Sequence, residues 1–191
     1  MRRTAFFLVA MAFLAGCVPI GGMMTRTDLY RLNAASDFPG DLPDIADHLL
    51  IEPTAAPAGI DTPRIALSTS PNRLDYFAGR AWTNRAAPMV QALLVESFEN
   101  SGHIHAVGRD SVALRADYAI KNELRAFQVE YDGDLSDPAP KARVRLSVKL
   151  ICMDRRRIID STVFESIVSA KSTRFDHVII AFDAALETVL E

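Results

Sequence analysis

Two cysteines and four histidines are the side chains of this 191-residue chain best suited to covalent chemistry or metal binding. A thiol can accept an acyl group, or attack a substrate when a base stands beside it. Cys17 follows a basic start, an apolar run over residues 5–13 and the small residues Ala15 and Gly16. That order is typical of a secretory signal peptide, and the apolar run is too short to span a bilayer. The sequence therefore predicts export and cleavage directly before Cys17.

Residues 14–17 (LAGC) resemble the lipobox of bacterial lipoproteins. The resemblance implies that the Cys17 thiol and the new amino terminus carry acyl chains such as palmitate, and two or more chains hold a protein stably to a membrane. We expect residues 1–16 to be a lipoprotein signal peptide, 17–27 a lipidated tether and 28–191 a single domain. The residue after Cys17 is Val18 and not an aspartate, which favours the outer membrane and a domain that faces the periplasm.

The second cysteine, Cys152, shares the parity of the alternating apolar residues at 144–150. That parity predicts a buried thiol, which behaves as a small, inert hydrophobic group. There is no Gly-x-Ser-x-Gly motif, and nothing in the sequence supplies the base and orienting acid that a nucleophile needs. The sequence predicts no catalytic residue, and we interpret the chain as a protein other than an enzyme.

Three polar clusters have a functional and a simpler interpretation. His103 and His105 alternate on a short predicted strand and could chelate a metal, but a solvated strand face is favoured because no third ligand is near. Asp132, Asp134 and Asp137 are spaced like calcium ligands, but a polar hairpin turn is favoured because the rest of the twelve-residue pattern is missing. Arg155-Arg156-Arg157 is a solvated hairpin tip or a contact for lipid phosphates or an acidic partner. The sequence predicts no metal site and no cofactor.

Removing residues 1–16 takes away Arg2 and Arg3 and no acidic residue, so the formal charge falls from −3 to −5. A mildly acidic domain argues against nucleic acid as a partner, since nucleic acid selects basic surfaces. If Cys17 carries lipid, Cys152 is left without a partner, and no disulfide framework is expected.

The order of predicted elements is strands, a helix, more strands and a second helix. Apolar stripes at helical spacing predict helices over residues 86–101 and from about 175 to 190, the first capped by Thr83 or Asn84 and ended by Gly102, the second capped by Ser172 or Thr173. Short connections between the long strands predict antiparallel pairing. The expected fold is α/β (α+β) with two layers: a mixed, mostly antiparallel sheet with two helices packed on one face.

One long predicted strand, residues 117–131, changes the parity of its apolar residues near Ala126, which implies a bulge or a change of buried face. With a change of face, Phe127, Val129 and Tyr131 would form an exposed apolar patch that contacts a neighbouring copy or another partner. The alternative is that the arm at residues 33–47 covers this patch within one chain. Trp82 is either a core residue or a second partner contact, because tryptophan is enriched at binding hot spots.

Several segments together resemble the ABC-type transport auxiliary lipoproteins. They begin with Tyr30-Arg31-Leu32, and the most similar stretches are 61–67 (DTPRIAL), 74–77 (LDYF), 81–83 (AWT) and 88–94 (PMVQALL). Residues 118–127 and 144–153 continue the resemblance. These are pattern motifs spread over almost all of the mature chain, and they include no catalytic signature.

The resemblance implies a lipoprotein that works beside an ABC transporter and an MCE-family protein in lipid transport between the inner and outer membranes. We expect the domain to dock or assemble that system and to form a homo-oligomer, with the membrane contacted through the N-terminal lipid. The alternative is a periplasmic lipid-binding carrier with an apolar pocket between the sheet and the helices.

Overall fold

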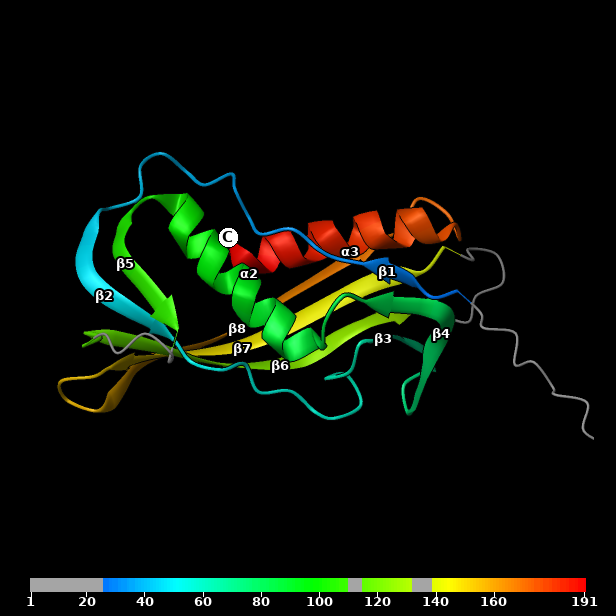
Figure 1. The fold of residues 1–191 in the computed structure, drawn as a ribbon, viewed down its shortest axis with the longest axis horizontal. Coiled ribbons are helices and arrows are strands. Elements are labelled where there is room, and N and C mark those ends of the chain that lie inside the picture. Colours follow the sequence, from blue (N-terminus) through cyan, green and yellow to red (C-terminus); the bar gives the residue numbers. More distant parts are fainter. Residues whose placement is uncertain (1–25, 110–114, 132–138) are drawn as a thin grey trace, which may run out of the picture.

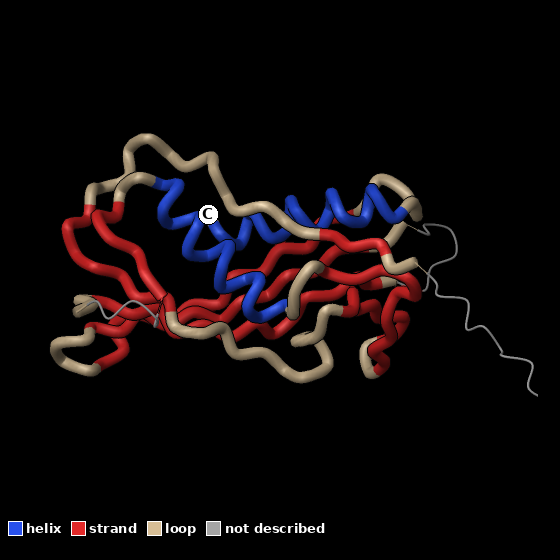
Figure 2. The backbone as a smooth tube through the Cα atoms, in the orientation of Figure 1, coloured by secondary structure: helices blue, strands red, loops and turns tan. Residues whose placement is uncertain are grey.

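A computed structural model describes residues 26–109, 115–131 and 139–191. Figures 1 and 2 show an elongated domain in which two helices lie over long strands. In chain order the elements are β1 (Asp28–Tyr30), β2 (Ile45–Ile51), β3 (Arg64–Ser70), β4 (Arg73–Trp82), α2 (Ala86–Ser101), β5 (Ile104–Arg109), β6 (Tyr118–Glu130), β7 (Lys141–Cys152), β8 (Arg157–Ser169) and α3 (Phe175–Leu190).

One eight-stranded sheet organises the domain, and it branches at β6. One edge of β6 pairs antiparallel with β7, from Tyr118↔Cys152 to Glu130↔Lys141. On its other edge, the start of β6 pairs with β2 and its end pairs with β3. β5 extends the β2 branch, β4 and β1 extend the β3 branch, and β8 lies outside β7. Within the described part of the chain, the sheet therefore ends in β1, β5 and β8.

The prediction of a mostly antiparallel sheet is wrong, because four of the seven strand pairings are parallel. Parallel neighbours need a long crossover connection. α2 lies between β2 and β5 in the sequence and supplies such a crossover for that parallel pair. The antiparallel pairing of β6 with β7 and of β7 with β8, which have short connections, is confirmed.

Both predicted helices are present, and both lie on the same side of the long strands (Figure 1). α2 ends at Gly102, which has φ of 70° and donates its amide to the Glu99 carbonyl, as a left-handed terminator does. The predicted side-chain caps are wrong: Arg85 and Arg174 precede the two helices, and neither forms a side-chain cap hydrogen bond. Both helices bury an apolar stripe, and the Ala87 amide in the first turn of α2 donates to the Asp61 carboxylate at 3.2 Å.

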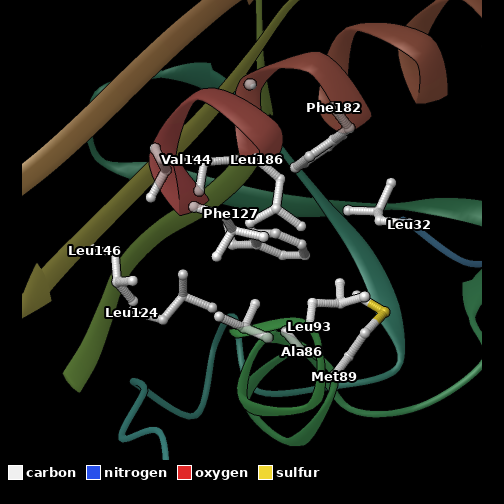
Figure 3. Packing of buried hydrophobic residues seen from close by; sticks show 14 of the residues in the cluster. Leu32, Ala86, Met89, Leu93, Leu124, Phe127, Val144, Leu146, Phe182 and Leu186 are labelled. Carbon is white, nitrogen blue, oxygen red and sulfur yellow. The ribbon is translucent and has the colours of Figure 1, made fainter. Parts of the chain in front are cut away.

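The centre of the core lies between the two helices and β6. Phe127 of β6 is 1% exposed, and its ring centroid lies 5.0 Å from that of Phe182 in α3 and 5.4 Å from that of Trp82 in β4. Figure 3 shows Phe127 between Phe182 and Leu186 of α3 on one side and residues of α2 on the other. These three rings join two strands of the sheet to α3, so we expect them to dominate the stability of the domain.

Candidate anchoring and docking sites

Cys17, the predicted lipid attachment point, lies outside the described residues. The described chain enters the fold at β1, whose Asp28 pairs in parallel with Arg80 of β4. Asn33 then donates its backbone amide and its side-chain amide to the two carboxylate oxygens of Asp183 in α3, at 2.8 and 2.7 Å. Figure 1 shows β1 at one end of the long axis and the β7–β8 hairpin tip at the other. A tether that precedes β1 therefore joins the domain at the end opposite that tip.

The arm after β1 packs on the helices. Leu32 and Ala35 are buried, the Ala35 amide donates to the Ser97 hydroxyl at 2.9 Å, and Asn100 donates to the Ala35 carbonyl at 2.9 Å. The alternative that this arm covers the Phe127–Tyr131 segment is therefore wrong: it holds α2 and α3 together, on the face of the helices away from β6 (Figure 1).

The prediction that Phe127 and Val129 form an exposed patch is wrong, since they are 1% and 0% exposed. β6 pairs Leu124 with Leu146 and then Ala126 with Arg145, so one residue of β6 is extra at this point. A bulge of one residue shifts the parity and leaves the same face of the strand toward the core. The predicted bulge is present, and it keeps the apolar residues on both of its sides beneath the helices.

The other two predicted partner contacts, Trp82 and Tyr131, differ in their exposure. Trp82 is 2% exposed, which leaves it no surface for a partner contact. Tyr131 is half-buried, and burial raises the pKa of its phenol. It lines a polar pocket of about 440 Å³ with Gln128, Glu130 and residues of β3. Of the four predicted partner contacts, only Tyr131 keeps an accessible side chain.

A polar network lies beside that pocket on the outer face of the sheet. Arg143 donates to Glu165 at 2.7 Å and to Glu130 at 3.2 Å, and Arg145 lies 3.8 Å from Glu165. The hydrogen bond to Glu165 raises the pKa of the Arg143 guanidinium. The network joins β6, β7 and β8 across the face that the helices leave uncovered, and it neutralises Glu165 within the chain.

The remaining polar candidates form no reactive site among the residues that the structure describes. His103 contacts Asp44 at 2.8 Å, and the rings of His48 and His105 stack with centroids 6.1 Å apart. No group of three or more histidine, cysteine, aspartate or glutamate residues in the described ranges could hold a metal ion. Arg155-Arg156-Arg157 is exposed at the hairpin tip. The aspartates at 132, 134 and 137 lie outside the described residues.

Cys152 is half-buried and not fully buried as predicted. Its parity on β7 is correct, but it is the last residue of the strand, beside a polar pocket that Asp154 and Arg156 also line. We expect Cys152→Ala to change the free energy of unfolding by less than about 1 kcal/mol, because a half-exposed small side chain leaves little cavity. Urea denaturation of both proteins measures this. A loss above about 2 kcal/mol, or a transport defect at parental protein levels, would contradict an inert structural thiol.

The structure shows two exposed apolar features; the sequence prediction missed the first and named no residues of the second. The first is β8, which carries five exposed large apolar residues: Ile158, Ile159, Val163, Phe164 and Ile167. The signal was present, since both parities of residues 157–169 contain large apolar side chains and the segment has neither lysine nor proline. The second is an apolar groove of about 470 Å³ between β2, the end of α2 and the starts of β6 and β8, lined mainly by Ile45, Leu49, Phe98, Ile104, Ile120, Leu150 and Ile159.

The described residues thus form a mixed sheet with two helices on one face, and they expose apolar side chains on β8 and in the groove beside β2. Within the described ranges, no helix has the length and apolarity to cross a membrane. Comparison with known families matches residues 30–191 to the ABC-type transport auxiliary lipoprotein component. The chain belongs to this family. Because the family consists of lipoproteins, the location of the protein is the cell envelope.

Two solved structures have a similar fold, and one further protein is similar in sequence. Protein XCC0632 from Xanthomonas campestris has a similar structure, with a TM-score of 0.79, 29% identity, and coverage of 86% of this chain and 90% of that chain. A second solved structure, of an uncharacterized protein, has a TM-score of 0.63 and 15% identity over 86% of this chain and 94% of that chain. An uncharacterized protein of Bradyrhizobium diazoefficiens is 25% identical over 170 residues, which is 88% of this chain and 44% of the relative. This chain thus spans less than half of that relative's length.

Proposed function

We propose that this protein is an outer-membrane lipoprotein that docks and assembles an MCE-type, ABC-transporter-driven system for lipid movement between the two membranes. The family match over residues 30–191 carries the proposal, because it covers the domain from the last residue of β1 onward. The geometry is consistent with it: a tether enters at β1, and the hairpin tip at the far end of the long axis stays free for a partner (Figure 1).

The exposed chemistry supports docking more than catalysis. The surface offers apolar side chains on β8 and three consecutive arginines at the hairpin tip. Exposed apolar side chains that gather on one element mark interaction sites. A docking protein needs such surfaces and no reactive group, whereas a hydrolase needs a nucleophile with an adjacent base.

The test is co-purification from detergent-solubilised membranes. We expect the full chain, tagged at its C-terminus, to recover an MCE-family protein and the subunits of its ABC transporter. Mass spectrometry identifies the recovered proteins, and a tagged unrelated lipoprotein of the same membrane is the control for non-specific capture. Recovery of neither component, from membranes that contain both, would overturn the docking role.

The apolar groove beside β2 favours one second candidate, a carrier that binds a lipid in its own domain. Its volume of about 470 Å³ and its largely apolar lining lie in the range of small-molecule sites. If the carrier role holds, native mass spectrometry of the purified chain detects a bound lipid, and Leu150→Trp, which fills the groove, removes it. A lipid-free parent protein with intact transporter binding would leave docking as the function.

A further inference from the structure

β8 is an edge strand of unusual length and composition. It runs over 13 residues, Arg157–Ser169, and pairs on one side with β7 from Cys152↔Arg157 to Lys141↔Ser169. No other strand of the described residues pairs with β8. Its outer edge therefore presents backbone N–H and C=O groups along about 40 Å, at about 3.3 Å per residue. Such an edge is a template for pairing with another strand.

Apolar side chains stand on both faces of this edge. Val163 and Ile167 lie opposite Ser147 and Arg143, which places them on the outer face of the sheet, and they are 42% and 52% exposed. Phe164 lies opposite the core residue Leu146, on the helix side of the sheet, and is 43% exposed. A strand added outside β8 would cover all three side chains.

The usual protections of an edge strand are nearly absent. Natural sheets shield an edge with lysine or proline, a short strand or a bulge. Residues 157–169 contain neither lysine nor proline. The single irregularity is the extra residue Ile159, between the pairs Leu150↔Asp160 and Ile151↔Ile158, close to the start of the strand. The stretch from Ser161 to Ser169 pairs with β7 in regular register. α3 packs on part of β8, and no described strand pairs with the other edge of β8.

The charges of β8 suit a second copy of the same strand. Glu165 is neutralised within the chain by Arg143 and Arg145, which leaves Arg157 and Asp160 as one charge of each sign. In antiparallel pairing about a two-fold axis at Val163, opposite residues share a face. Glu165 then meets Ser161 and Asp160 meets Ser166 of the other copy, so no like charges face each other.

The area buried by pairing of two β8 edges is small, and it suits two copies of the chain that are tethered to the same membrane. An edge about 40 Å long and about 10 Å thick buries roughly 400 Å² on each partner, half of what a stable interface usually buries. Association through the edge alone is therefore weak in dilute solution. Two copies tethered to one membrane surface have a raised effective concentration, which compensates for a small interface.

We propose that β8 is a self-association edge, against which a second copy of this chain docks through backbone pairing and the side chains of Val163, Phe164 and Ile167. The expected homo-oligomer thus forms through β8, and the buried side chains of Phe127 and Val129 stay in the core. The proposal rests on β8 alone and does not depend on the transporter partner.

The test places p-benzoylphenylalanine at Val163 in the full chain and irradiates intact membranes. The expected product has twice the mass of the chain, and its cross-linked peptides come from this chain only. The matched control carries the photoreactive residue at Ile180, which is 66% exposed on α3 and not on β8, and is expected to give no such product. Capture of a different protein at Val163, or of nothing, overturns the proposal.

A second arm measures self-association of the full chain purified in detergent. Val163→Lys and Ile167→Lys place lysine on an exposed edge, where the monomer fold tolerates it, and circular dichroism verifies the fold. Sedimentation velocity is expected to show at least fivefold weaker association for both variants and parental association for Ile180→Lys. Unchanged association of both edge variants overturns the proposal, whatever the co-purification of transporter subunits shows.

Discussion

Replacement of Phe127 by alanine is expected to lower the free energy of unfolding by about 3–5 kcal/mol, the range for a fully buried phenylalanine. The ring is 1% exposed and packs against Phe182 and Trp82, which also contact each other at 5.2 Å between centroids. Removing the Phe127 ring leaves a cavity that is bounded by two large rings and both helices (Figure 3). This cavity cannot collapse unless the sheet moves. Urea denaturation, monitored by the fluorescence of the single tryptophan, measures the loss.

The matched control is Phe164→Ala, which makes the same chemical change on the exposed edge of β8. Phe164 is 43% exposed, so at low protein concentration we expect a loss below about 1.5 kcal/mol. Equal losses for the two variants would show that Phe127 does not occupy the centre of the core.

Val129→Glu is expected to lower the free energy of unfolding as Phe127→Ala does, since it places a carboxylate at a position with 0% exposure.

Strong periodicity made much of the fold predictable. The bounds of α2 agree with the prediction over residues 86–101, and α3 begins at the predicted residue. β7 alternates apolar and polar residues, so its pairing in an antiparallel hairpin with β8 followed from the sequence. Local patterns sufficed for these elements because their neighbours in space are also their neighbours in sequence.

The parallel branches were not predictable in the same way. β2 and β3 lie one after the other along one edge of β6, although the sequence separation of the paired residues is large: Leu49 pairs with Tyr118 and Ala66 with Gln128. Direction and order there depend on the crossover through α2, which no local pattern records. The branching of the sheet at β6 therefore could not be predicted from local sequence patterns and required the structure.

The prediction of an exposed docking patch at Phe127, Val129 and Tyr131 was wrong for Phe127 and Val129, and the reason is physical. A parity change in β6 indicated either a bulge or a change of face, and the bulge at Arg125 restores the same face. The exposed apolar surface lies two strands away on β8, where both parities are apolar. A strand with apolar residues on both faces usually reads as a central, buried strand, so exposure could not be inferred without the topology.

Replacement of Cys17 by alanine is expected to abolish lipid attachment and to leave an uncleaved or misrouted precursor. The reason is chemical: alanine has no thiol to accept an acyl chain, and without two chains or more the membrane anchor is marginal. Metabolic labelling with an alkyne fatty acid measures attachment on the immunoprecipitated chain, and an electrophoretic mobility shift reports the retained signal peptide. The chain offers a matched control in Cys152→Ala, which removes the other thiol and is expected to keep parental label. Equal label on the Cys17→Ala chain and the parent, or loss of label from Cys152→Ala alone, would show that Cys17 is not the attachment point.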